Sequence, residues 1–267
     1  MINVGFIGAG NMGYAIMKGI KGNEYMNNNI SLSAFDSFSP VMDRLNSLGV
    51  SKCECITEVV RKCKYVFLAV KPQQLDVVLS EVKASMNKDT VIISICAGIT
   101  GDYIKSRTIP NARVILVMPN TPLLLGEGAT AIAKVEPVAE YEYEVVRSIF
   151  AACGECVAIS QDKMKEIIAI NSSSPAFIYL FAKAFIDYAA SVGIDAEVAK
   201  ALFAKALIGS AKMITDSGKS IDELITMVSS KGGTTIAGLE KLREGNLSQT
   251  VQNCCEACTK RAYELSK

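Results

Sequence analysis

Short apolar runs separated by helical stretches fill the first part of the chain. The runs are rich in Val, Ile and Phe and are bounded by Gly, Pro or Asn, as buried strands usually are. They predict strands at residues 3–7, 30–35, 65–69, 91–94, 113–118, 129–133 and 156–159. Helical patterns lie between the early strands, for example at 12–21, 40–48 and 74–85. This alternation predicts an α/β fold, a doubly wound and mostly parallel sheet with helices on both faces.

The second part of the chain has no strand pattern. Apolar positions predict helices at residues 162–171, 175–192, 196–215 and 248–265, with shorter helices between them. The change of pattern divides the chain into residues 1–160 and an all-α domain of residues 161–267. Apolar positions in the second domain, among them Ile178, Phe181 and Leu202, exceed what one copy can bury, which favours a homodimer. The alternative is that these positions pack on the first domain.

Composition excludes several classes of partner. The 28 basic and 27 acidic residues leave a net charge of +1, whereas nucleic-acid and membrane-surface proteins usually carry a basic excess. Lys183 and Asp187 interrupt the longest apolar run, so we expect no membrane-spanning helix. The chain starts directly with a strand pattern and shows no secretion signal. We therefore expect a cytoplasmic protein that binds neither nucleic acid nor membrane.

Cysteine and histidine usage limits the chemistry. Nine cysteines, an odd number, indicate reduced thiols rather than a disulfide framework. The pairs Cys153/Cys156 and Cys255/Cys258 have metal-ligand spacing, but they lie far apart in a chain without histidine, so we expect no metal. The absence of histidine excludes Ser-His-Asp hydrolases, Cys-His proteases and histidine-dependent hydroxyacid dehydrogenases.

A glycine motif follows the first predicted strand and opens a helix. In this context the spacing of Gly8, Gly10 and Gly13 predicts a Rossmann-type dinucleotide site. The first glycine permits the turn, the second lets the backbone approach a pyrophosphate, and the third packs helix on strand. Asn11 and Met12 complete the loop, and the helix N-terminus offers free amides to the anion.

The residues after the second strand bear on the choice of cofactor. Asp36 is placed to bind ribose hydroxyls, which favours NADH. Ser37, with Ser33, Ser39 and Arg44, could instead hold the additional phosphate of NADPH. An aspartate in a solvated loop is an equally good reading, so the cofactor is either NADPH or NADH.

Later strand ends should line the same crevice, because ligands bind at the carboxyl edge of such sheets. These ends contribute three further groups of cofactor-binding candidates: Val70, Lys71 and Pro72; Ala97 and Gly98; and Asn120. Proline residues stiffen the first and last of these loops. Each segment alone could be an ordinary turn.

Several segments together resemble the pyrroline-5-carboxylate reductase family. The resemblance rests on the glycine loop and on five further segments: Val70-Lys71-Pro72, Met118-Pro119-Asn120-Thr121-Pro122, Ser173-Ser174-Pro175-Ala176-Phe177, Gly209-Ser210-Ala211-Lys212-Met213 and Val228-Ser229-Ser230-Lys231-Gly232-Gly233-Thr234-Thr235-Ile236. It covers essentially the whole chain. It implies reduction of 1-pyrroline-5-carboxylate to L-proline by NAD(P)H, the last step of proline biosynthesis. It also implies a homodimer through the helical domain, with dimers able to assemble further into a decamer.

The resemblance also assigns the substrate site. It places Ser230, Gly232, Gly233, Thr234 and Thr235 in the substrate loop, with Ser174 as a further substrate contact. Glycine backbone amides can form an anion nest for a carboxylate, although the same residues could be only a turn and helix cap. In the implied mechanism, the catalytic residues are Thr235, at the ring nitrogen, and Ser230, at the carboxylate. An iminium carbon is already electrophilic, so hydride transfer needs orientation more than a strong base.

Two departures from the family pattern keep rival functions open. Ser172 stands where the family commonly has glycine, and Lys231 where it commonly has proline. They put the substrate range in question and are the only support for a nicotinamide-binding sensor without catalysis. The other rival is a hydroxyacid or different imine reductase, for which Lys163 or Lys165 would be the catalytic lysine at the start of the second domain.

Overall fold

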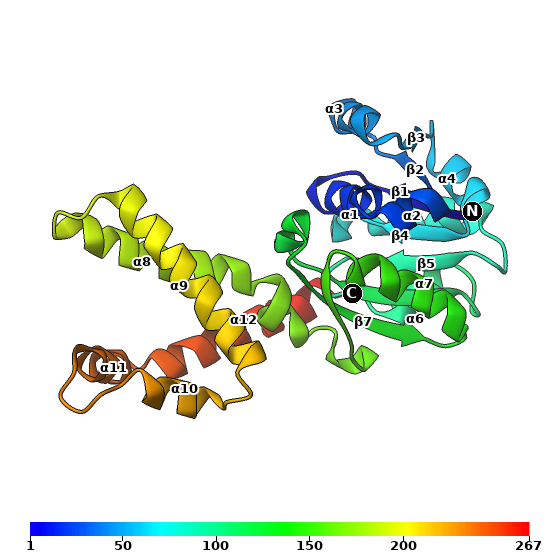
Figure 1. Cartoon of the computed structure of the whole chain (residues 1–267). Helices are drawn as coiled ribbons and strands as arrows, with labels where there is room; N and C mark the ends of the chain where they lie inside the picture. The colour runs from blue at the N-terminus through cyan, green and yellow to red at the C-terminus, as the bar shows by residue number, and fades with distance from the viewer. Residues whose placement is uncertain (267) are drawn as a thin grey trace. The chain divides into compact units, whose positions relative to one another are not determined.

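Eight strands form one sheet in the N-terminal part of the chain. The computed structural model describes residues 1–266. The strands are β1 (Ile2–Ile7), β2 (Ile30–Phe35), β3 (Ser51–Lys52), β4 (Tyr65–Leu68), β5 (Val91–Ser94), β6 (Arg113–Met118), β7 (Gly128–Val135) and β8 (Gly154–Ala158). Their order is β3-β2-β1-β4-β5-β6-β7-β8, and all neighbours pair in parallel except β6 with β7 (Figure 1). The expected mostly parallel, Rossmann-type sheet is confirmed.

Helices connect these strands and cover the sheet. They are α1 (Asn11–Gly22), α2 (Glu24–Asn29), α3 (Ser39–Asp43), α4 (Ile56–Lys62), α5 (Leu75–Ser85), α6 (Gly101–Arg107) and α7 (Glu140–Ala151). Short 3₁₀ turns are η1 (Arg44–Leu48), η2 (Pro72–Gln74), η3 (Thr121–Leu125) and η4 (Gln161–Lys163). The helix expected at 40–48 is therefore a short α-helix that continues as a 3₁₀ turn.

Alternating strand residues build a separate core on each face of the sheet. Phe6 and Phe67 belong to one cluster and stack with ring centroids 4.5 Å apart, whereas Val66 and Leu68 belong to the other. Successive side chains of a strand point to opposite faces, so a strand buried on both faces must be apolar throughout. This explains why β4 and β5 could be recognised as unbroken apolar runs.

A buried ion cluster lies at the start of α7. The Glu142 side chain is fully buried, and its Oε1 is 2.7 Å from Arg113 Nη1 and 2.9 Å from Lys64 Nζ. Burial raises the pKa of this carboxyl, but hydrogen bonds from Lys64, the Ala139 amide and Tyr141 outweigh it and hold the pKa below its ordinary value. The carboxylate therefore stays ionised inside the fold.

The segment after β8 differs from the predicted helix at 162–171. It contains η4 and then a π-helix, η5 (Ile168–Ser172), in place of a continuous α-helix. The Ser173 amide donates to the Ile168 carbonyl over 2.8 Å, which is the bond that widens the turn. The Asn171 side chain, through Nδ2, holds the turn to β6 and β7 by bonds to the carbonyls of Met118 (2.6 Å) and Ala129 (3.0 Å).

The remaining helices are α8 (Ser174–Ser191), α9 (Ala196–Asp216), α10 (Ile221–Met227), α11 (Thr234–Glu244) and α12 (Leu247–Leu265). Side chains cap two of them: Asp195 accepts the first amides of α9, and Ser220 forms a capping box with Glu223 on α10. Phe203 of α9 stacks on Phe185 of α8 with centroids 4.4 Å apart. None of the helices in residues 1–266 combines the length and apolarity that a bilayer crossing requires.

Contacts divide the chain into two compact units. One contains Met1–Pro175 together with the residues from Ala257 onward, and the other contains Ala176–Glu256. The expected boundary at residue 160 follows the change from strands to helices. The compact unit extends further, because the Asn171 side chain holds the π-helix to the sheet and the end of α12 contacts the loop after β5.

The Ala176–Glu256 unit leaves large apolar side chains exposed. Ile178, Phe181, Phe185 and Leu202 have exposed fractions of 47%, 40%, 44% and 69% in the single chain. Exposed apolar surface on this scale is typical of a face that another protein surface covers.

Candidate functional site

A pocket of about 380 Å³ lies where β1, β4, β5 and β6 end. It is lined by Gly10, Asn11, Met12, Ala69, Val70, Lys71, Pro72, Ile95, Cys96, Ala97, Met118, Pro119 and Ser172. Seven of the residues expected to bind the cofactor therefore meet here: Gly10, Asn11, Met12, Val70, Lys71, Pro72 and Ala97. The carboxyl edge of a parallel sheet is the place where such folds bind nucleotides.

The three glycines of the loop have different environments. Gly8 has a left-handed φ of 94°, and a Cβ there would lie 2.4 Å from the Ala69 carbonyl oxygen. A Cβ on Gly13 would lie 2.6 Å from the Gly8 oxygen, so the helix start and the loop touch. A Cβ on Gly10 would meet no atom within 4 Å. The fold therefore requires glycine at positions 8 and 13, whereas the bare backbone at Gly10 faces open space that a pyrophosphate can enter.

Asp36 has a structural task in addition to any ligand role. Its Oδ2 accepts from the Ala9 amide over 2.8 Å, and its Oδ1 accepts from the Phe38 amide over 2.9 Å. The carboxylate thus ties the glycine loop to the loop after β2. Ser37 beside it is exposed, and the Arg44 guanidinium lies 4.6 Å from the centroid of the Tyr14 ring.

Six of the thirteen expected cofactor residues do not line this pocket: Gly8, Gly13, Asp36 and Ser37, described above, and Gly98 and Asn120. Gly98 has a φ of 79°, and a Cβ there would lie 2.7 Å from the Ala262 carbonyl oxygen of α12. Asn120 is 6% exposed, accepts from the Ala129 amide (2.9 Å) and donates to the Asn171 carbonyl (3.1 Å). Both residues serve packing between segments of this unit, which their positions after strands could not reveal.

Cys96 lines the pocket without being a nucleophile. Its thiol donates to the carbonyl oxygens of Val70 (3.3 Å) and Leu68 (3.5 Å). Burial raises the pKa of this thiol to about 11, so it stays protonated at neutral pH. Residues 1–266 hold nine free thiols, and none of their Cys, Asp and Glu side chains gather into a group of three that could hold a metal ion.

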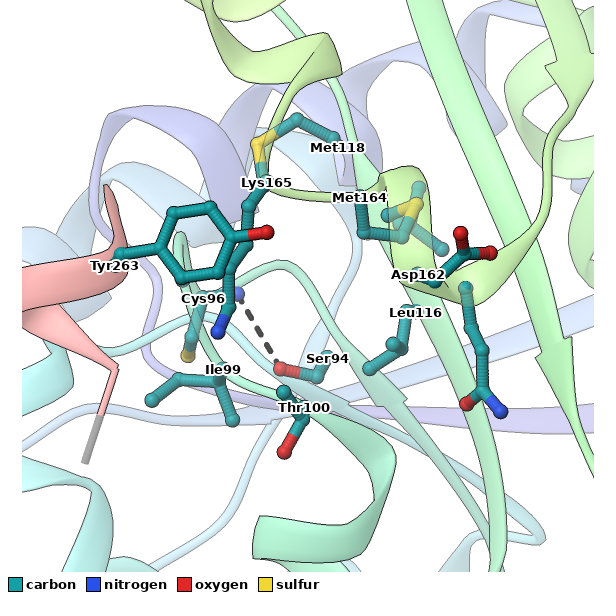
Figure 2. Close-up of a pocket in the computed structure, with 13 residues that line it drawn as sticks. Ser94, Cys96, Ile99, Thr100, Leu116, Met118, Asp162, Met164, Lys165 and Tyr263 are labelled. Carbon is teal, nitrogen blue, oxygen red and sulfur yellow. Dashed lines mark hydrogen bonds between the residues drawn. The ribbon is translucent and has the colours of Figure 1, made fainter. Parts of the chain in front are cut away.

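A second pocket, of about 250 Å³, adjoins the first (Figure 2). It is lined by Ser94, Cys96, Gly98, Ile99, Thr100, Leu116, Val117, Met118, Gln161, Asp162, Met164, Lys165 and Tyr263. Cys96 and Met118 line both pockets and form a shared wall. No local sequence pattern predicts this pocket, because Tyr263, near the end of α12, completes it.

The expected substrate loop precedes α11 in the other unit. Gly232 has a φ of 73°, and the Gly233 amide donates to the Ser230 carbonyl over 2.9 Å. A Cβ on Gly233 would lie 2.7 Å from Ser230 Oγ and 3.0 Å from the Ser230 carbonyl oxygen, so a side chain there would require Ser230 to shift. Thr234 and Thr235 form the first turn of α11 and are exposed, as is Ser230. Ser174 begins α8, and its Oγ is 3.4 Å from the Asn171 carbonyl oxygen.

Comparison with known proteins identifies the family. A pyrroline-5-carboxylate reductase dimerisation model matches residues 161–265, and a model of NADP oxidoreductases, coenzyme F420-dependent, matches residues 3–98. Pyrroline-5-carboxylate reductase 3 of Xenopus laevis is 35% identical, across 99% of this chain and 96% of its own length. The Escherichia coli (strain K12) pyrroline-5-carboxylate reductase is 33% identical, across 99% of this chain and 98% of its own. The chain belongs to the pyrroline-5-carboxylate reductase family.

Solved structures of the family share the whole fold. The Plasmodium falciparum pyrroline carboxylate reductase with NADP bound superposes with a TM-score of 0.90 at 29% identity, and covers 99% of this chain and 98% of that one. The Coxiella burnetii pyrroline-5-carboxylate reductase gives 0.89 at 32% identity, with 100% and 99% coverage. The resemblance found in the motifs is thus confirmed over both units.

The structure bears on the hydroxyacid rival to this family. That reading needs Lys163 or Lys165 at the nicotinamide, but neither residue lines the pocket at the glycine loop. The Lys163 side chain is 63% exposed and pairs with Asp162 over 3.6 Å, whereas Lys165 lines the adjoining pocket. Ser172, the departure from the family pattern, does line the glycine-loop pocket and narrows it relative to glycine.

Proposed function

We propose that this protein reduces the cyclic imine 1-pyrroline-5-carboxylate to L-proline by hydride transfer from NAD(P)H, the last step of proline biosynthesis. Full-length similarity to pyrroline-5-carboxylate reductases is the observation that supports it most strongly. The glycine-loop pocket is consistent with this reaction, because it combines a helix N-terminus with a bare backbone at Gly10.

The glycine-loop pocket is the proposed site for the pyrophosphate and nicotinamide of the cofactor. Gly10, Asn11 and Met12 would hold the pyrophosphate through backbone amides at the start of α1. Lys71, Ala97 and Ser172, on the later strand ends and η5, would lie beside the nicotinamide ring. When bound, the reduced cofactor supplies the hydride. Each Asp36 oxygen already accepts one backbone amide, and a carboxylate oxygen has a second lone pair with which it could accept a ribose hydroxyl.

The loop before α11 is proposed to bind the substrate carboxylate. The Gly233 amide already donates to the Ser230 carbonyl. The proposed donors to the carboxylate are therefore the Gly232 amide, the first amides of α11 at Thr234 and Thr235, and the Ser230 hydroxyl. These groups bind a carboxylate without a basic side chain. Gly232 provides the left-handed turn that brings them together, and Ser174 is proposed as a further contact.

The reduction itself demands little acid–base chemistry. A protonated cyclic imine has an electrophilic carbon; that carbon gains the hydride while its nitrogen keeps the proton and becomes the amine of proline. The Thr235 hydroxyl is proposed to accept a hydrogen bond from the protonated ring nitrogen. The protein's contribution is then orientation and exclusion of water, which fits a chain without histidine.

The assembly and location of the protein follow from the same proposal. We propose a homodimer through the exposed apolar faces of α8 and α9, in the region matched by the dimerisation model. Further assembly into a decamer is proposed from the family resemblance, and light scattering after gel filtration would measure it. Nine free thiols favour the cytoplasm as its location.

The decisive experiment follows the oxidation of NADH and of NADPH in the presence of 1-pyrroline-5-carboxylate, with proline identified as the product. Turnover with proline formation supports the proposal, and the ratio of the two rates gives the cofactor preference. Cofactor binding without turnover on this substrate or on a panel of other cyclic imines would refute it and favour the sensor function.

A further inference from the structure

The adjoining pocket contains a lysine, Lys165, that has no ionic partner among the residues that the structure describes. Lys165 Nζ donates to Ser266 Oγ over 2.8 Å and lies 4.4 Å from the centroid of the Tyr263 ring. Among residues 1–266, no carboxylate lies within ion-pair distance of it. Tyr263 is held in turn by a 2.7 Å bond from its hydroxyl to Glu166 Oε1. The ammonium is therefore positioned, only partly exposed, and free to pair with an anion.

A serine hydroxyl faces the same space. Ser94 is only 2% exposed, and its Oγ accepts the Cys96 amide over 3.3 Å (Figure 2). Because the neighbouring Cys96 thiol stays protonated, it is a weak acceptor, and the Ser94 hydrogen can be donated to a bound oxygen atom. Figure 2 shows the Asp162 carboxylate on the opposite side of the pocket from the Lys165 ammonium.

The rest of the lining indicates which kind of anion fits. Much of the wall is apolar, and its apolar side chains are Ile99, Leu116, Met118 and Met164. One ammonium and one hydroxyl cannot satisfy the oxygens of a phosphate dianion, but they match the two oxygens of a carboxylate. A pocket of about 250 Å³ also leaves room for a small apolar body.

We infer that this pocket is a second ligand site, for a small organic monocarboxylate with an apolar body. Lys165 and Ser94 bind its carboxylate, and the apolar wall holds the remainder. The site is separate from the cofactor pocket but shares Cys96 and Met118 with it. A ligand there therefore touches the wall of the cofactor pocket without competing for the glycine loop.

Methionine methyl groups report on the two pockets separately. Met164 lines only the proposed carboxylate site, Met12 lines only the cofactor pocket, and Met118 lines both. The full chain, labelled at the methionine methyls, would be titrated with isovalerate and with its neutral isostere isovaleramide, followed by NMR. We expect saturable shifts of Met164 and Met118 but not of Met12, with a dissociation constant of about 1 mM or below for isovalerate. The affinity for the amide should be lower by about 10-fold or more.

A matched pair of variants tests the role of the charge. Lys165→Met keeps the length of the side chain and removes its ammonium, and should weaken isovalerate binding by about 10-fold or more. Lys83→Met removes an exposed ammonium of α5 that does not line the pocket, and should leave binding unchanged. Four results would each overturn the inference. They are the absence of a saturable shift at ten times the expected dissociation constant, equal binding of the amide, equal effects of the two variants, and a shift of Met12 together with Met164. None of these readouts depends on turnover, so they are independent of the proposed function.

Discussion

Gly10 and Gly13 offer a matched pair of substitutions that separates cofactor binding from folding. A methyl group on Gly10 enters open space beside the helix start and meets no protein atom within 4 Å. Gly10 has a φ of −58°, which alanine adopts without strain, so stability should stay within about 1 kcal/mol of wild type. Cofactor affinity should fall, because the methyl occupies the space through which the pyrophosphate reaches the backbone. Loss of one hydrogen bond to a charged group, about 1.5–3 kcal/mol, corresponds to about 10–150-fold in affinity.

Gly13→Ala should show the opposite pattern. Its methyl would lie 2.6 Å from the Gly8 carbonyl oxygen, so backbone must shift. Overpacking of this kind costs about 1–3 kcal/mol, and the melting temperature should fall by about 2–12 °C. Thermal unfolding and cofactor titration by fluorescence measure both variants. Gly22→Ala, at the open far end of α1, is the control. The reasoning fails if Gly10→Ala unfolds like Gly13→Ala, or binds cofactor as tightly as wild type.

Three further predictions concern separate parts of the chain. Thr235→Ala should lower kcat by about 100-fold in the steady-state assay. The melting temperature should not change, because the side chain is exposed. Thr235→Ser should restore most of the lost turnover, and wild-type turnover in the alanine variant would remove Thr235 from the mechanism. Glu142→Gln should cost about 2 kcal/mol, less than a fully buried pair because its cations are partly exposed. The pKa of Glu142 is lowered in the folded state, so the stability that its carboxylate adds is present at pH values above its ordinary pKa and is lost as the pH falls through the folded pKa. In chemical denaturation, the stabilities of the variant and of wild type should therefore converge in acid. A constant difference between them at every pH would contradict this. Gly98→Ala should lower the melting temperature, because Gly98 has a left-handed φ and the added methyl would meet the Ala262 carbonyl. An unchanged melting curve would show that the segments at Gly98 and Ala262 can move apart without loss of stability.

The sequence predicts which strand-end residues meet at the glycine-loop pocket, because strand ends carry topological information. Once β1, β4 and β5 are recognised as parallel neighbours, the residues that follow them must meet at one edge. Lys71 and Ala97 could therefore be placed at the pocket without any knowledge of side-chain direction.

Features that depend on side-chain direction could not be predicted in this way. Asn120 follows a strand like Lys71, yet its amide turns toward Ala129 and Asn171. The apolar pattern of 168–172 fits an α-helix, and only the Asn171 bonds to β6 and β7 distinguish the π-helix. Strand β3 has two polar residues, which give no apolar run to detect. The pocket around Lys165 joins segments about a hundred residues apart, which no local pattern connects.

The double hydrogen bonding of Asp36 matters for attempts to redesign cofactor preference. Exchanging the acidic residue after the second strand is the obvious route from NADH toward NADPH. In this chain the exchange would also free the Ala9 amide and loosen the loop that we propose to hold the pyrophosphate, whichever nucleotide is offered. Redesign that retains Asp36 and places a cationic side chain at the exposed Ser37 would change selectivity while keeping the loop in place.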